Sequence, residues 1–151
     1  MSSFKSIVVP TDFSENSARA LATGLRLAAD LGAAVRVVHV VPASFLRTAV
    51  NEGLLATDDT DETIRSKVEE LVRRKFEELL APFGDAGAAA ERVVLKGDPG
   101  RAIVAYLCEH GGDIVVMGRR GANLRDAILG SETEQVVRRS PCPVLVVRRT
   151  G

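Results

Sequence analysis

A glycine-bearing loop between residues 118 and 131 has the composition of a site for an anion. Gly118 and Gly121 allow the backbone to approach a phosphate group closely, because glycine has no side chain to obstruct it. Gly130 and Ser131 precede a helical pattern, and the free N–H groups and dipole of a helix N-terminus favour negative charge. The Ser131 hydroxyl can add one more hydrogen bond. The spacing therefore predicts an anion cradle.

A second unusual stretch, Pro10-Thr11-Asp12, ends an apolar run near the N-terminus. Both stretches also have structural interpretations that need no ligand. Asp12 can act as a turn or capping residue. Ser131-Glu132-Thr133-Glu134 fits a capping box, in which Ser131 would be the N-cap of the following helix. The position of the two stretches in the fold has to decide between these interpretations.

Strands and helices alternate along the chain. Apolar runs predict strands, and apolar residues three and four positions apart predict helices. Residues 43–59 show no clear period and predict a mobile loop. Asp98 and Pro99 mark a helix start. The strands are predicted at 4–10, 34–41, 91–96, 113–117 and 143–147, and the helices at 18–31, 64–80, 99–110 and 132–139.

This order predicts one α/β domain over residues 1–151. Continuously apolar strands are typical of a parallel sheet that is covered on both faces. Right-handed crossovers then favour a doubly wound five-stranded parallel sheet in the order 3-2-1-4-5, with helices on both faces. Ligands bind beyond the carboxyl ends of such strands, where the winding direction reverses. The reversal falls between strands one and four, next to Pro10-Thr11-Asp12 and Gly118-Arg119-Arg120-Gly121.

Composition predicts a cytoplasmic protein. The 20 basic and 20 acidic side chains cancel, so no overall charge favours nucleic acid or an anionic membrane as a partner. No run approaches the roughly 20 apolar residues of a membrane span, and the first residues have no secretory pattern. Cys108 and Cys142 lack metal-ligand spacing and predict ordinary thiols. His39, inside an apolar run, predicts a structural role. We expect no metal site.

The whole chain resembles the universal stress protein family, in its UspA-like, nucleotide-binding form. The resemblance is carried by matching segments in the family's order over the full length: Ile7 to Ser14, His39-Val40-Val41, Gly97-Asp98-Pro99, Met117 to Gly121, Gly130-Ser131, and Pro141 to Val147. It implies an adenine nucleotide, ATP or else AMP or ADP, with Mg²⁺ accompanying it.

The same resemblance implies roles for individual residues. Asp12, after Pro10 and Thr11, would bind the ribose hydroxyls, and the backbone near Val40 would meet the adenine edge. Gly118, after Met117, would lie by the ribose. The phosphates would be lined by Gly121, Gly130, Ser131 and the backbone N–H of Glu132.

The resemblance also implies a homodimer in which the last strand, Pro143–Val147, pairs with that of a second subunit. An apolar edge strand fits this arrangement, because it would otherwise invite uncontrolled pairing. One departure stands out. The family pattern G-x2-G-x9-G-[S/T] has nine residues where this chain has eight between Gly121 and Gly130.

Several functions are compatible with this pattern. The first is an adenine-nucleotide-binding stress or signalling protein with an unidentified protein partner. The alternative is a dimeric interaction module that has lost nucleotide binding through the shorter loop, with Arg119, Arg120 and Arg125 contacting a partner. Efficient phosphoryl transfer is disfavoured, because the chain has no G-x-x-x-x-G-K-[S/T] segment and no lysine in the glycine loop. At most we expect slow ATP hydrolysis, and no catalytic residue is predicted.

Overall fold

A computed structural model describes residues 4–53, 61–119 and 130–148 of the chain. Its sheet has five parallel strands in the order β3-β2-β1-β4-β5, which confirms the predicted topology. The strands are β1 (Ser6–Pro10), β2 (Ala34–Val41), β3 (Glu91–Lys96), β4 (Ile114–Gly118) and β5 (Val144–Val147).

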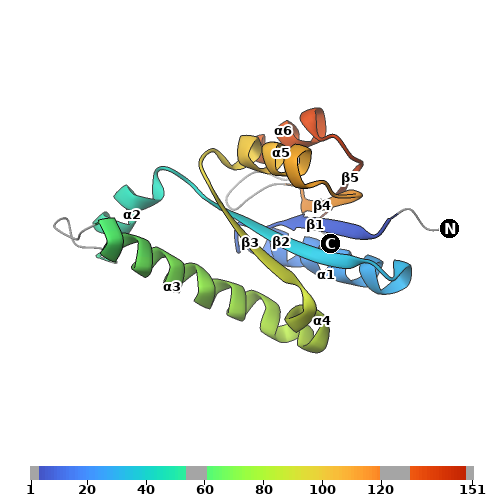
Figure 1. The fold of residues 1–151 in the computed structure, drawn as a ribbon, viewed down its shortest axis with the longest axis horizontal. Helices are drawn as coiled ribbons and strands as arrows, with labels where there is room; N and C mark the ends of the chain where they lie inside the picture. Colours follow the sequence, from blue (N-terminus) through green and yellow to red (C-terminus); the bar gives the residue numbers. More distant parts are fainter. Residues whose placement is uncertain (1–3, 54–60, 120–129, 149–151) are drawn as a thin grey trace.

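Helices cover both faces of the sheet (Figure 1). On one face, α1 and α3 pack over a core that includes Leu21 and Phe76. On the other face, α5 and α6 pack over a core that includes Ile103 and Val136. The helices are α1 (Glu15–Leu31), α2 (Phe45–Asn51), α3 (Asp61–Leu80), α4 (Gly84–Ala89), α5 (Pro99–His110) and α6 (Ser131–Arg139), with a 3₁₀ turn at Ala81–Phe83.

Local sequence signals explain where the helices begin and end. The Ser14 side chain caps α1 by accepting a hydrogen bond from the Ser17 N–H, and Gly32 ends that helix in the left-handed conformation. Asp98 caps α5 through the Arg101 N–H, with Pro99 in the first turn, as predicted. Both starts lie at the carboxyl end of the sheet, so the caps also fix the loops there.

The interpretation of residues 43–59 as a loop was wrong in part, because Phe45–Asn51 forms α2. Its Ala49 is only 1% exposed, so this short helix is held by packing rather than by an intrinsic preference. Residues 54–60 lie outside the described part of the chain. The alanine-rich segment that forms α4 was also missed, since it has no clear apolar period.

Parallel pairing places the functional stretches at one edge of the sheet. β1 pairs with both β2 and β4, so the winding reverses beside β1. Pro10 ends β1 and Gly118 ends β4, and the segments after both strands leave the same edge. The topological switch point therefore lies where the sequence predicted it.

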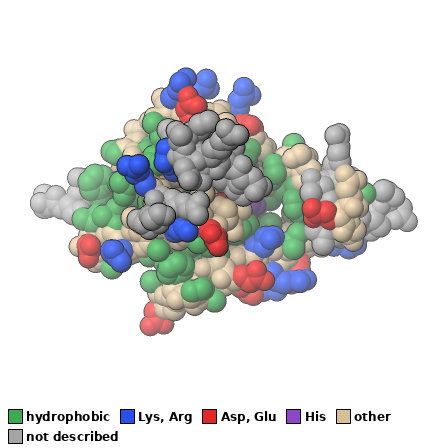
Figure 2. Space-filling model, turned by 180° about the vertical axis from the view of Figure 1, so that it is seen from behind, with side chains coloured by type: hydrophobic (Ala, Val, Ile, Leu, Met, Phe, Trp, Pro, Cys, Tyr) green, Lys and Arg blue, Asp and Glu red, His purple; other side chains and the backbone are tan. Residues whose placement is uncertain are grey.

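Charged side chains of both signs are interspersed on the face seen in Figure 2, which fits the zero net charge of the chain. Within the described ranges, no helix is both long enough and apolar enough to cross a membrane. Cys108 is exposed and Cys142 partly exposed, and both are free thiols.

Candidate functional site at the switch point

Thr11 anchors the segment that leaves β1. It is buried, and its N–H donates to the Val38 carbonyl at 2.8 Å. Its hydroxyl donates to Ser17 Oγ at 2.8 Å and accepts from the Phe13 N–H at 3.0 Å. These bonds tie the end of β1 to the first turn of α1. They hold the backbone on both sides of Asp12.

Asp12 is exposed at the edge of the sheet, with one carboxylate oxygen engaged in the local turn. Its Oδ1 accepts from the Ser14 N–H at 2.9 Å, so the predicted turn role is present. A carboxylate has two oxygens and about four acceptor positions. The turn therefore leaves Asp12 able to accept further hydrogen bonds from a ligand.

The next residue, Phe13, is one that the sequence did not single out. It has a positive φ of 65°, a left-handed conformation that is rare for a bulky side chain. Its ring packs against His39 at 4.3 Å between centroids and against Phe76 at 5.2 Å. This packing holds a strained backbone beside Asp12, and strain of this kind clusters at functional sites.

His39 has the structural role that the sequence favoured. Its Nδ1 lies 2.8 Å from the Thr11 carbonyl oxygen. Burial lowers the pKa of the imidazole, so the ring is neutral at pH 7. A carbonyl only accepts, and Nδ1 therefore carries the proton. His39 thus links β2 to the segment before Asp12.

Gly118 lies where β4 meets the N-terminus of α1, and there is little room for a side chain. A Cβ atom at this position would come within 3.0 Å of the Asn16 carbonyl oxygen and 3.2 Å of its carbon. The Gly118 carbonyl accepts a hydrogen bond from Thr133 Oγ1 at 2.9 Å. Gly118 therefore connects the end of β4 with α1 on one side and α6 on the other.

We expect Gly118→Ala to destabilise the fold by roughly 1–3 kcal/mol, because an added methyl group would push against backbone. The methyl group would displace the backbone of Asn16 in α1, the helix that follows Asp12. Nucleotide binding should therefore weaken as well. Urea unfolding and titration calorimetry measure the two effects. An unchanged unfolding midpoint would contradict the close packing described here.

Gly130 occupies the N-cap position of α6, and Ser131 is the first helical residue. No side chain makes a capping hydrogen bond at Gly130, so the capping-box interpretation of Ser131 was wrong. The first N–H groups of a helix have no partner within the helix itself. The exposed Ser131 hydroxyl is likewise not used as a cap. Backbone donors at this end are thus available to an anion.

The Glu132 carboxyl, in the first turn of α6, is influenced by two other carboxylates at this edge. Burial, and then the nearby charges of Asp12 and Asp98, raise the pKa of the Glu132 carboxyl to about 7. These interactions place the first turn of α6 close to the segments after β1 and β3. From the sequence we expected Glu132 to contribute only its backbone N–H, and we did not expect Asp98 to lie near Glu132.

The structure thus brings Asp12, Gly118, Gly130, Ser131 and Glu132 to one edge of the sheet. The side chains of four further predicted residues, Pro10, Thr11, Val40 and Met117, are buried beneath that edge. The last predicted residue, Gly121, lies outside the described residues, as do Arg120 and Arg125.

Comparison with known proteins agrees with this architecture. Residues 3–148 match the profile of the Universal stress protein family. The chain therefore belongs to the universal stress protein family.

Relatives match over nearly their whole length. Universal stress protein MJ0577 of Methanocaldococcus jannaschii is 30% identical over 97% of this chain and 96% of its own. Universal stress protein YxiE of Bacillus subtilis is 30% identical, over 96% of this chain and 99% of its own.

Solved structures have the same fold. The structure of MJ0577 superposes with a TM-score of 0.77 and 31% identity, covering 98% of both chains. A universal stress protein in complex with cAMP has a TM-score of 0.67 at 22% identity, covering 99% of this chain and all of its own. One from Archaeoglobus fulgidus in complex with dAMP has a TM-score of 0.64 at 21% identity, covering 98% of this chain and 100% of its own.

Proposed function

We propose that this protein binds an adenine nucleotide at the switch point between β1 and β4 and acts in the cytoplasm as a stress-response or signalling protein. The observation that carries the proposal is the electrostatic influence of Asp12 on Glu132 in the first turn of α6. A carboxylate that can accept hydrogen bonds from hydroxyls is then near a helix end whose N–H groups can donate to phosphates.

Two family structures with adenine nucleotides support the choice of ligand. One is in complex with cAMP and the other with dAMP, and both share this fold. In our proposal, Asp12 accepts from the ribose hydroxyls and the backbone near Val40 meets the adenine. Gly118 lies by the ribose. Gly121, Gly130, Ser131 and the Glu132 N–H surround the phosphates.

A magnesium ion fits beside a triphosphate at this edge. Mg²⁺ is usually held by one or two carboxylates, several waters and the substrate phosphates. Within the described residues no group of three or more metal-ligating side chains gathers, but Glu132 lies within the electrostatic influence of Asp12. The Glu132 carboxylate would hold the ion together with waters and the phosphates, and the ion would neutralise charge between them.

Titration calorimetry with ATP, ADP and AMP, each with and without Mg²⁺, tests the proposal. We expect saturable binding with one nucleotide per chain. Absence of binding at millimolar nucleotide would overturn it and favour the alternative, an interaction module that has lost nucleotide binding. Mass analysis of small molecules retained through purification would identify the nucleotide bound in the cell.

The second part of the proposal is a homodimer paired through β5. This strand is an edge of the sheet, and its Leu145 is 40% exposed. Val137 on the adjacent helix α6 is 44% exposed. Pairing of β5 with its copy across a two-fold axis would cover this apolar edge.

Light scattering after size exclusion tests the dimer. We expect the unmodified chain to have twice the monomer mass, and Leu145→Lys to have the mass of one chain. Val94→Lys is the matched control, because Val94 is 49% exposed on β3 at the opposite edge. A monomeric unmodified chain, or a Leu145→Lys variant that remains dimeric, would contradict this arrangement.

A further inference from the structure

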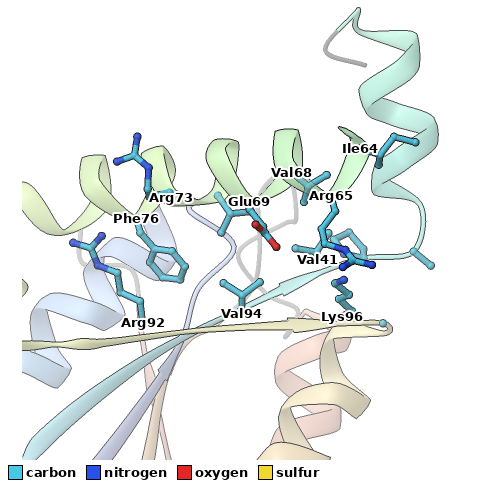
Figure 3. Close-up of a pocket in the computed structure, with 14 residues that line it drawn as sticks. Val41, Ile64, Arg65, Val68, Glu69, Arg73, Phe76, Arg92, Val94 and Lys96 are labelled. Carbon is cyan, nitrogen blue, oxygen red and sulfur yellow. The ribbon is translucent and has the colours of Figure 1, made fainter. Parts of the chain in front are cut away.

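A cavity of about 870 Å³ lies between α3 and the strands β2 and β3 (Figure 3). It opens on the sheet face that α1 and α3 cover. Helix α6, whose N-terminus belongs to the proposed nucleotide site, packs on the other face of the sheet. None of the predicted nucleotide-site residues lines it. Its size is within the 300–1,000 Å³ that is typical of small-molecule sites. The cavity is therefore a separate place where a ligand can bind.

The walls of the cavity are apolar and form a wedge. Phe76 and Val72 are 2% and 5% exposed, so α3 is packed against the core at that point. One and two turns nearer its N-terminus, Val68 and Ile64 are only half-buried. Val94, on the strand beneath, remains 49% exposed. The channel between helix and sheet therefore runs along α3 from Ile64 to Phe76.

The charged side chains that line this channel are mostly cationic. There are four cations, Arg65, Arg73, Arg92 and Lys96, and one acidic residue, Glu69. Figure 3 shows the charged ends of Arg65 and Lys96 turned toward each other at the same end of the cavity.

One of these four cations is already neutralised. Arg73 is engaged by Glu70 at 2.6 Å and by Glu77. In the part of the chain that the structure describes, Arg65, Arg92 and Lys96 have no ion pair. With Glu69 as the lone acid, the lining keeps an excess of positive charge.

We propose that this cavity binds a single-chain amphiphile with a carboxylate head, such as a medium-chain fatty acid. An unbranched hydrocarbon tail matches the elongated apolar walls, and its burial supplies the affinity. The carboxylate would lie between Arg65 and Lys96, since a guanidinium binds carboxylates with two parallel hydrogen bonds. A nucleotide is a poor match, because the hydroxyl groups of its ribose would meet valine and phenylalanine side chains.

Titration calorimetry with octanoate, decanoate and dodecanoate, all below their critical micelle concentrations, tests the proposal on the full chain. We expect one site, with an affinity that rises up to about fourfold for each added methylene group. Dodecyltrimethylammonium has the same tail with a cationic head. It should bind at least about tenfold more weakly than dodecanoate, because it would meet uncompensated cations.

Variants separate the head group from the tail. Arg65→Glu with Lys96→Glu should weaken dodecanoate binding about tenfold, since two exposed charges change sign. The matched control, Arg26→Glu with Lys75→Glu, makes the same change of net charge at exposed residues outside the cavity and should bind normally. Val94→Trp fills the channel from the sheet and should abolish binding. Thermal unfolding verifies that each variant is folded.

Several results would overturn the proposal: no binding of dodecanoate, equal binding of the cationic amphiphile, or unchanged binding in both cavity variants. A dimer that Val94→Trp dissociates would show that a second copy of the chain covers this face instead. The nucleotide proposal is tested independently, because Asp12→Ala should leave dodecanoate binding unchanged. Failure at one site therefore leaves the other unaffected.

Discussion

Replacing Asp12 with alanine should weaken adenine nucleotide binding by about tenfold to a hundredfold. This range corresponds to the loss of hydrogen bonds to a charged group. The Asp12 carboxylate lies at the edge of the sheet with one oxygen engaged by the Ser14 N–H, and the proposed ribose contacts would use its remaining acceptor positions. Titration calorimetry with AMP, ADP and ATP measures the change.

The sign of this effect distinguishes hydrogen bonding from simple charge. Asp12 is negative and acts electrostatically on Glu132 in the first turn of α6, where phosphates would bind. If Asp12 contributed charge alone, its removal would tighten the binding of an anionic ligand. Weaker binding in Asp12→Ala therefore indicates direct hydrogen bonds. Unchanged or tighter binding would remove Asp12 from the site.

Asp12→Asn is the matched variant for the local turn. Asparagine can still accept from the Ser14 N–H, because Asn forms the same type of turn as Asp. Its amide oxygen can accept from one ribose hydroxyl but carries no charge. We expect an affinity between those of the unmodified protein and Asp12→Ala, with an unfolding midpoint close to that of the unmodified protein.

AMP binding should weaken about tenfold between pH 6 and pH 8 when it is measured without divalent metal. The pKa of Glu132 is about 7, raised first by burial and then by Asp12 and Asp98. Below this pH the carboxyl is neutral, and above it a negative charge lies at the helix end that would bind phosphate. A bound phosphate would raise the pKa further, so proton uptake should accompany binding near pH 7.

Glu132→Gln is the control for this pH dependence. AMP itself titrates over the same range, and the titration of free AMP is the same for the variant and the unmodified protein. The difference between them therefore reports Glu132 and its coupling to the bound phosphate, and at pH 8 the variant should bind AMP more tightly. Calorimetry in buffers of different ionisation enthalpy measures the proton uptake. Identical pH profiles for the two proteins would contradict the proposed position of Glu132 beside the phosphates.

The same carboxyl should make stability depend on pH. Its pKa rises from the usual 4.5 to about 7 on folding, so the folded state holds the proton more tightly than the unfolded state does. The stabilisation by this proton is complete below pH 4.5 and is lost as pH rises through 7. Glu132→Gln should therefore unfold like the unmodified protein near pH 4. Above pH 7 it should be more stable by about 1–2 kcal/mol, once the partial exposure of the side chain is allowed for.

Much of the fold could be predicted from local sequence. Apolar runs such as Ile7–Val9 indicated buried parallel strands, and their alternation with helical patterns predicted the strand order that the structure has. Capping at Asp98 and the glycine stop at Gly32 were read correctly, because these signals depend only on neighbouring residues. Helix α2 was missed, since packing of Ala49 rather than a local pattern supports it.

The candidate site depends on both levels. Sequence alone determined which chemical groups follow β1 and β4, and the chain order placed both at the switch point. Tertiary structure decided that Gly130, not Ser131, caps α6. Several features depend on residues far apart in the chain. Asp12 and Asp98 help to raise the pKa of Glu132, and Asn16 limits the space for a side chain at Gly118. The cavity depends on how α3 packs on the sheet. Residue type and spacing contain the chemistry of each group, but only the folded chain sets the distances and burial through which these groups act.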